Sequence, residues 1–222
     1  MPAYFPLFVD LEGHRCLVVG GGPVAERKAR ALLDCDARVV VVSPRLTPAL
    51  ASLAAAGRIE HRARTFRVSD VRGCRLIVAA AGDPVDRAVV AAARRRRVLV
   101  NAVDRPAWCD VIVPLVLRRG ALQIAVSTGG RSPALAREIR RRLEPLFGRE
   151  LGALVERAGR ERALALVRAR TAVGRARAGE RVARRALAAA GNLVPADQPA
   201  GGLRPTPLKN VYEKVPSASA VR

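Results

Sequence analysis

Short runs of consecutive apolar residues, rather than alternating ones, mark the first half of the chain. The runs lie at residues 15–20, 38–43, 76–81 and 98–101, and a further short strand is expected at residues 59–62. Helical spacing of apolar residues appears between them, at residues 25–34, 47–56 and 83–96. Continuous runs rich in Val, Ile and Leu are typical of parallel strands that are buried on both faces. This β-α-β alternation with short connections therefore predicts a doubly wound parallel sheet of the α/β class.

The pattern changes after residue 110, which indicates further parts of the chain. Two extended segments, a polar glycine loop, a helix and a second helical stretch are expected at residues 110–117, 122–126, 127–133, 134–146 and 151–190. Five prolines and a Gly-Gly pair after residue 191 predict a disordered tail. We therefore divide the chain into a nucleotide-binding domain, a short connecting region, a small helical domain and a tail, at residues 1–112, 113–147, 148–190 and 191–222.

The first apolar run enters a glycine turn of the form G-x-G-x-x-A, and a helix follows it. Gly20 permits the tight turn, and Gly22 lets the backbone approach a pyrophosphate. Pro23 and Val24 complete the turn, and Ala25 is small enough for the helix to lie close to the strand. This strand–turn–helix context predicts a Rossmann-type dinucleotide site, although a tight turn without a ligand remains the alternative.

The end of the second apolar run bears on the choice of dinucleotide. An acidic residue at this point normally accepts the ribose 2′-OH of NAD. This chain has Ser43, Pro44 and Arg45 instead. Ser43 could bond a ribose hydroxyl and Arg45 could pair with a 2′-phosphate, so these residues leave NAD and NADP both open.

Two further places carry candidate chemistry. Asp104 comes directly after the apolar run that ends at Asn101, where ligands of open α/β sheets bind. Its carboxylate could act as a general base, or it could merely close the turn before Pro106. The loop from Ser127 to Pro133 could form an anion site before a helix, or serve only as that helix's cap.

Composition excludes several classes of protein. The net charge of +21 comes almost entirely from arginine, and only seven residues are aromatic, which argues against a nucleic-acid partner. The sequence shows no membrane span and no secretory signal pattern, so a cytoplasmic protein is expected. The four scattered cysteines predict free thiols, and His14 and His61 are expected at the surface, without a catalytic role.

Five sequence blocks together resemble the precorrin-2 dehydrogenase module of siroheme synthases. They occur in that family's order across residues 4–147: Phe5–Leu11, Gly20–Ala29, Asn101–Asp104, Cys109–Pro114 and Val126–Ala136. The resemblance implies an intertwined homodimer, with residues 113–147 as its dimerisation and active-site region. It also implies that the protein oxidises precorrin-2 to sirohydrochlorin and passes a hydride to NAD. Some members also insert Fe²⁺, as a substrate, to give siroheme.

The resemblance also assigns roles to residues. Asp104 matches the family's essential aspartate, which would serve the dehydrogenation and, where present, the metal insertion. The cofactor contacts fall on Gly22, Pro23, Val24, Ser43, Pro44 and Arg45. Carboxylate groups surround the ring of precorrin-2, and an arginine guanidinium binds a carboxylate through two parallel hydrogen bonds. Substrate contacts are predicted at Asn101, Ser127, Thr128, Gly129, Arg137, Arg140 and Arg141.

Two functional hypotheses follow. The first is the NAD-dependent precorrin-2 dehydrogenase, with or without ferrochelatase activity. The second is a regulatory module that binds NAD without catalysis, which would leave Asp104 and the Ser127–Pro133 loop without a purpose. Binding of NAD without any turnover of precorrin-2 would favour the second.

Overall fold

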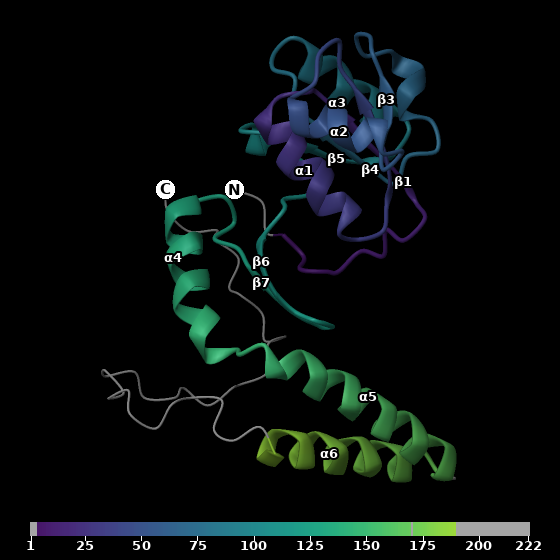
Figure 1. The fold of residues 1–222 in the computed structure, drawn as a ribbon, viewed down its shortest axis with the longest axis vertical. Helices are drawn as coiled ribbons and strands as arrows, with labels where there is room; N and C mark the ends of the chain where they lie inside the picture. The colour runs from purple at the N-terminus through teal and green to yellow at the C-terminus, as the bar shows by residue number, and fades with distance from the viewer. Residues whose placement is uncertain (1–3, 170, 190–222) are drawn as a thin grey trace, which may run out of the picture. The chain divides into compact units, whose positions relative to one another are not determined.

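The computed structural model describes residues 4–169 and 171–189 (Figure 1). The chain divides into two compact units. The first comprises the residues up to 118 together with 122–145, and the second comprises 119–121 together with the residues from 146 onward. The predicted tail at 191–222 lies outside the described residues.

A five-stranded parallel sheet forms the centre of the first unit. Its strands are β1 (Arg15–Val19), β2 (Arg38–Val42), β3 (Glu60–Arg62), β4 (Leu76–Ala79) and β5 (Leu99–Ala102). They lie in the order β3-β2-β1-β4-β5, and every neighbouring pair is parallel. The order reverses between β1 and β4, which is the point at which doubly wound sheets bind ligands. The predicted α/β class with a parallel sheet is confirmed.

Helices cover both faces of this sheet. They are α1 (Pro23–Leu33), α2 (Pro48–Ala55) and α3 (Val85–Arg95), with short 3₁₀ turns η1 (Val68–Val71) and η2 (Pro106–Trp108). Alternate residues of the strands β1, β2 and β4 face opposite cores. Val18 packs in the same core as Ala29 and Leu50 of α1 and α2, whereas Leu17 shares the other core with Val89 of α3. These three strands are continuously apolar because each of them contributes to both cores.

In the sheet and the helices that cover it, the element boundaries differ from the expected ones by one or two residues. The strands expected to reach Gly20, Ser43 and Ala81 end at Val19, Val42 and Ala79. Gly20 has a φ of 126°, so the chain already turns there. Helix α1 begins at Pro23 rather than Ala25, because proline at the first helical position loses no hydrogen bond.

The remainder of the first unit is a hairpin and a helix. Strands β6 (Leu115–Arg119) and β7 (Leu122–Val126) pair with each other, and α4 (Pro133–Leu143) and the 3₁₀ turn η3 (Glu144–Leu146) follow. The helix expected to run to Leu146 ends early because Pro145 cannot donate its N–H. The segment expected to be extended from Asp110 becomes a strand only at Leu115. Residues 110 and 111 instead donate hydrogen bonds to the Val100 carbonyl of β5.

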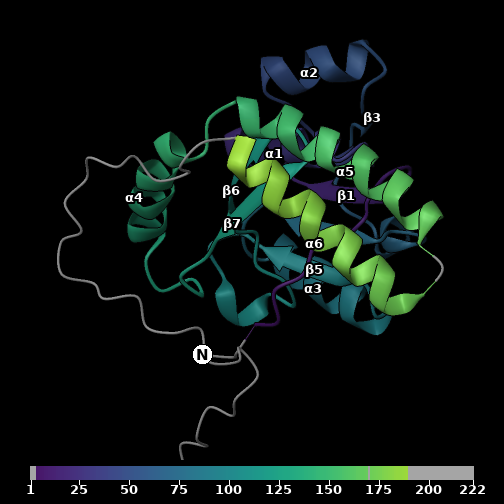
Figure 2. The same cartoon turned by 90° about the horizontal axis from the view of Figure 1, so that it is seen from below.

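The second unit is a helical hairpin. Helices α5 (Glu150–Arg168) and α6 (Ala172–Ala189) lie side by side and run in opposite directions (Figure 2). The β6–β7 connection belongs to this unit, and a side chain at Gly120 would come within 3.2 Å of Gly152 at the start of α5. Within residues 4–169 and 171–189, no helix is long and apolar enough to cross a membrane.

Candidate functional site

The carboxyl ends of three strands meet at one edge of the sheet. Val19 of β1 is in register with Ala79 of β4, which is in register with Ala102 of β5. The hydrogen bonds from the Ala80 amide to Val19 and from the Val103 amide to Ala79 extend this alignment into the loops. Since neighbouring strands lie about 4.8 Å apart, the turn after β1 and the loop after β5 are separated by about 10 Å. The predicted glycine turn and Asp104 therefore share one edge.

The three glycines after β1 have different roles. A side chain at Gly20 would collide with the Ala80 carbonyl, and one at Gly21 would collide with the Arg45 carbonyl. A side chain at Gly22, in contrast, would meet no protein atom within 4 Å. The turn is thus packed on both sides against neighbouring loops, while Gly22 borders open space. The importance of Gly21 was missed from the sequence, because it occupies a variable position of the motif.

A cavity of about 600 Å³ lies over this turn. Its lining comprises Val19, Gly20, Gly21, Gly22, Val42, Ser43, Pro44, Arg45, Leu46, Thr47, Arg64, Thr65, Phe66, Ala80, Ala81 and Val85. The helix α1 begins here, and its first hydrogen bond joins the Glu26 amide to the Gly22 carbonyl. The amides of Val24 and Ala25 precede that bond and have no acceptor within the helix, which suits an anion. The open space at Gly22 and this helix end fit the pyrophosphate of a dinucleotide.

Alanine substitutions should separate the two roles of the glycines. Gly21→Ala is expected to lower the thermal stability, since the loop carrying Arg45 must move. Gly22→Ala is expected to leave the melting temperature nearly unchanged and to weaken NAD binding by about tenfold or more, since the methyl group enters the ligand space. Thermal unfolding and titration calorimetry of the two variants check this. Equal NAD affinity in Gly22→Ala and the wild type would contradict it.

The loop after β2 is held tightly against the glycine turn. The Ser43 hydroxyl donates to the Arg45 carbonyl at 2.6 Å, and the Thr47 amide donates to the Gly21 carbonyl at 2.9 Å. The Thr47 hydroxyl donates to Glu26 at 2.7 Å, a bond that lowers the pKa of that carboxyl. His61, expected at the surface, is half-buried, and its Nε2 lies 3.0 Å from the Ser43 carbonyl. These bonds fix the backbone from which Arg45 projects.

A buried carboxylate supports the wall of the cavity near Arg64. Asp70 is fully buried, and it accepts hydrogen bonds from Arg62 at 2.7 Å, from Arg64 at 2.6 and 2.8 Å and from the Arg67 amide at 2.8 Å. Burial by itself would raise the pKa of Asp70, but these donors outweigh it and hold the pKa well below its usual range. Asp70 thus fixes the segment that places Arg64, Thr65 and Phe66 in the lining.

A second buried carboxylate fixes the loop after β4. Asp86, in the first turn of α3, accepts hydrogen bonds from the amides of Ala81 at 3.0 Å and Gly82 at 3.1 Å. This is the loop that packs against Gly20. The sequence offered one signal for this role, an acidic residue close to the start of a helix.

Asp104 is exposed in the loop after β5 and has a left-handed φ of 55°. Aspartate tolerates this conformation better than most residues. Lys28 of α1 is within electrostatic range of both Asp104 and the Cys109 thiol. Burial, helped by the charge of Arg27, lowers the pKa of Lys28, while the thiol and Asp104 partly counteract this. Sequence reasoning missed Lys28, although it is the only lysine among the described residues.

The same loop is fastened by Asn101 and Cys109. The Asn101 amide group donates to the Val111 carbonyl at 3.0 Å, so this predicted substrate contact is already engaged in holding the loop. The Cys109 thiol donates to the Ala102 carbonyl at 3.1 Å, and burial raises its pKa. All four cysteines are free, as predicted; Cys16 and Cys74 are buried, and Cys35 and Cys109 are half-buried.

The polar loop before α4 is folded by its own hydroxyl groups. The Thr128 hydroxyl donates to the Ser132 carbonyl at 3.1 Å, and the Gly129 amide donates to the Ser127 hydroxyl at 3.1 Å. The Ser132 hydroxyl accepts from the Leu135 amide at 3.2 Å, which is the predicted helix cap. The backbone geometry at Gly129, with a φ of 63°, completes a tight loop.

The three predicted arginines of α4 differ in their partners. Arg141 forms a two-point ion pair with Glu138, and this pair together with Arg142 lowers the pKa of Glu138 to about 2. Arg140 lies 3.5 Å from Glu144. Arg137 is exposed, and none of the described residues pairs with it. Of the three, Arg137 is therefore the most available to an anionic ligand.

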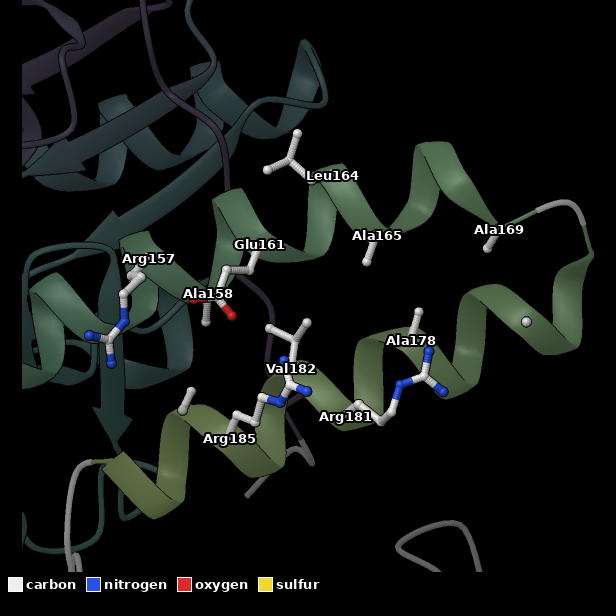
Figure 3. A pocket seen from close by; sticks show the side chains of 12 residues that line it. Arg157, Ala158, Glu161, Leu164, Ala165, Ala169, Ala178, Arg181, Val182 and Arg185 are labelled. Atoms are coloured by element: carbon white, nitrogen blue, oxygen red, sulfur yellow. The ribbon is translucent and has the colours of Figure 1, made fainter.

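A second, larger cavity lies within the helical unit and holds none of the predicted site residues. It has a volume of about 850 Å³ and lies between α5 and α6 (Figure 3). Ala165 points from α5 toward α6, and Ala178 points back. Arg157, Arg181 and Arg185 stand at its rim. The residues that line this cavity contribute positive charge. Among them, Glu161 has the one side chain suited to acid–base catalysis.

The described part of the chain contains no group of three or more His, Cys, Asp or Glu side chains placed to hold a metal ion. Asp104 remains the predicted contact for a metal substrate.

Two family models match this chain. Residues 7–115 match a model described as putative NAD(P)-binding, and residues 119–145 match one described as the central part of a sirohaem biosynthesis protein. Together with the switch-point cavity, these matches define an NAD(P)-binding protein of the Rossmann-like class.

Similar proteins narrow the class to a family. A siroheme synthase of Pseudomonas entomophila is 48% identical to this chain, over 72% of this chain and 35% of the length of the relative. A siroheme synthase of Thioalkalivibrio sulfidiphilus is also 48% identical, over 69% of this chain and 32% of the length of the relative. A solved structure, the precorrin-2 dehydrogenase SirC, is 25% identical with a TM-score of 0.63, covering 82% of this chain and 88% of SirC. The chain belongs to the siroheme synthase family, and it spans about one third of the length of these curated relatives.

Proposed function

We propose that the protein oxidises precorrin-2 to sirohydrochlorin with NAD as the hydride acceptor. The observation that carries this proposal is the shared edge of the sheet, where the glycine turn of the dinucleotide cavity follows β1 and Asp104 follows β5, with β4 between them. The siroheme synthase relatives and the likeness to a precorrin-2 dehydrogenase support the choice of substrate.

The residues divide the work between binding and proton transfer. The turn at Gly20, Gly21 and Gly22 and the start of α1 bind the pyrophosphate, and the Ser43–Arg45 loop receives the ribose. Bound NAD supplies the hydride acceptor. The oxidation releases one hydride and one proton from the ring, and Asp104 takes the proton. Arg137 and the glycine loop before it contribute contacts to the carboxylates of the macrocycle.

A substrate with many carboxylates favours a protein rich in positive charge. Residues 137–185 hold 15 arginines and 6 acidic residues. Arginine stays charged when it is partly buried and binds carboxylates through two parallel hydrogen bonds. This excess supports a polyanionic substrate.

The proposal includes a homodimer formed through residues 113–147. Leu135 and Ile139 of α4 and Val113 are exposed large apolar side chains, at 52%, 37% and 46% of their surface. Exposed large apolar side chains are candidates for burial in a protein interface. Sedimentation analysis at several protein concentrations measures the oligomeric state.

An anaerobic absorbance assay with precorrin-2 and NAD tests the proposed activity. Appearance of NADH together with sirohydrochlorin is the expected result. Addition of Fe²⁺ or Co²⁺ then measures whether the protein accelerates metal insertion above the protein-free rate. Folded protein that binds NAD but forms no NADH would overturn the enzymatic proposal and favour the regulatory one.

A further inference from the structure

Trp108 lies just beyond the loop that carries Asp104, and two guanidinium groups lie over its indole ring. It ends η2 and packs against the core between the sheet and α3. The guanidinium carbon of Arg87 is 4.8 Å from the centre of the ring, and that of Arg105 is 5.2 Å from it. Both distances are within the roughly 6 Å of a cation–π interaction. The indole therefore gathers two positive charges next to the loop after β5.

The two arginines over Trp108 differ in their partners. Arg87 donates two hydrogen bonds to Asp83, at 3.2 and 3.3 Å, and these bonds raise the pKa of Arg87. Arg105 is exposed, and no carboxylate among the described residues pairs with its guanidinium. The donors of Arg105 therefore remain available to a ligand.

The backbone of Arg105 is fixed at both of its polar groups. Its carbonyl accepts a hydrogen bond from the Trp108 amide at 2.9 Å, and its amide donates to the Ala102 carbonyl of β5 at 3.4 Å. The indole of Trp108 holds the other end of the side chain. A group that is already ordered loses little conformational freedom when it binds a ligand, so its contacts contribute more to affinity.

The charge next to Asp104 gives Arg105 a purpose. A carboxylate of the substrate that approaches the loop after β5 is repelled by the Asp104 carboxylate, unless a cation lies close by. Lys28 is within electrostatic range of Asp104, but it is half-buried. Arg105 follows Asp104 directly in the chain and is exposed. Its guanidinium is therefore the cation of this loop that a substrate carboxylate can reach.

We propose that Arg105, held on the ring of Trp108, binds a carboxylate of the tetrapyrrole substrate beside Asp104. The inference rests on the proposed function and deepens it, because it assigns a substrate contact to a residue of the loop after β5. A planar guanidinium with free donors binds a carboxylate through two parallel hydrogen bonds. Such a contact is made equally to the substrate and to the transition state, so it affects binding rather than the chemical step.

Two measurements on the full chain test the proposal. In steady-state oxidation of precorrin-2 with saturating NAD, Arg105→Ala is expected to raise KM for precorrin-2 about tenfold and to change kcat by less than about twofold. Arg105→Lys should recover part of this loss, since it keeps the charge but not the planar pair of donors. Trp108 is the one tryptophan of the chain, so its fluorescence follows a titration with sirohydrochlorin without turnover. Arg105→Ala should weaken sirohydrochlorin binding about tenfold as well.

Arg75→Ala is the matched control. Arg75 is exposed directly before β4, at the opposite edge of the sheet, and its removal subtracts the same charge. Unchanged KM and sirohydrochlorin affinity in Arg105→Ala, or equal losses in Arg75→Ala, would overturn the proposal, and NADH formation by the wild type would leave the proposed function intact. Absence of NADH from the wild type would overturn the proposed function, and the sirohydrochlorin titration would still decide whether Arg105 binds the tetrapyrrole.

Discussion

Replacing Asp104 by asparagine is expected to lower the rate of precorrin-2 oxidation by about 10²- to 10⁴-fold, the usual contribution of a general base. NAD affinity should stay within about twofold of the wild type, since Asp104 follows β5 and is not among the residues that line the dinucleotide cavity. Single-turnover formation of NADH and calorimetric titration of NAD measure the two quantities.

Asparagine is the informative substitution because Asp104 has a φ of 55°. Asparagine tolerates this left-handed conformation, whereas alanine would add backbone strain to the loss of the carboxylate. Asp36→Asn is the matched control, because Asp36 is also exposed, has a φ of 54° and follows α1 at the other end of the sheet. An unchanged rate in Asp104→Asn, or an equal loss in Asp36→Asn, would remove Asp104 from the mechanism.

Replacing Asp70 by asparagine is expected to lower the free energy of unfolding by about 3 kcal/mol, the lower end of the cost of breaking a buried ion pair. The lower end applies because Arg62 and Arg64 keep 29% and 28% of their side chains exposed and can turn to solvent. Dinucleotide affinity should fall as well, because Arg64, Thr65 and Phe66 line the cavity. Urea unfolding of the variant, with and without NAD, measures both effects.

Glu60→Ala is the control for Asp70. It removes an exposed partner of the same Arg62 and should cost less than about 1 kcal/mol, as surface ion pairs do. Similar losses in the two variants would show that burial of Asp70 adds nothing.

The stability that Asp70 contributes should depend on pH. Its pKa is lower in the folded protein than in the unfolded chain, so the contribution is complete above the unfolded value of about 4. It is lost as the pH falls below that value toward the folded pKa. Wild-type protein should therefore lose more unfolding free energy than Asp70→Asn between about pH 5 and pH 2. Parallel pH profiles of the two proteins would contradict this assignment.

Much of the sheet could be predicted from the sequence. Strands β1, β2 and β4 each contribute side chains to two cores, which requires the continuous apolar runs that are visible in the sequence. The glycine turn and the cap at Ser132 were equally accessible, because their geometry depends on neighbouring residues alone. The errors fell at element ends, where Pro145 and the hydrogen bonds from residues 110 and 111 to Val100 decide the boundary.

Several of the contacts that hold the site together were not predictable, because their partners lie six or more residues apart and no helix or turn pattern pairs them. The sequence around Gly21 does not show that this variable position of the motif requires glycine. The requirement comes from the Arg45 carbonyl, which packs against Gly21 in the folded protein. Asp70 and Lys28 likewise acquire their roles from Arg62, Arg64 and Asp104, which only the fold brings near. By itself the sequence determined the parallel sheet, the dinucleotide turn and the position of Asp104 after a strand, since short-range periodicity and turn chemistry encode these. The tertiary structure decided that Arg64 is bound to Asp70 while Arg45 is exposed, because an ion pair depends on the partners that folding places within reach.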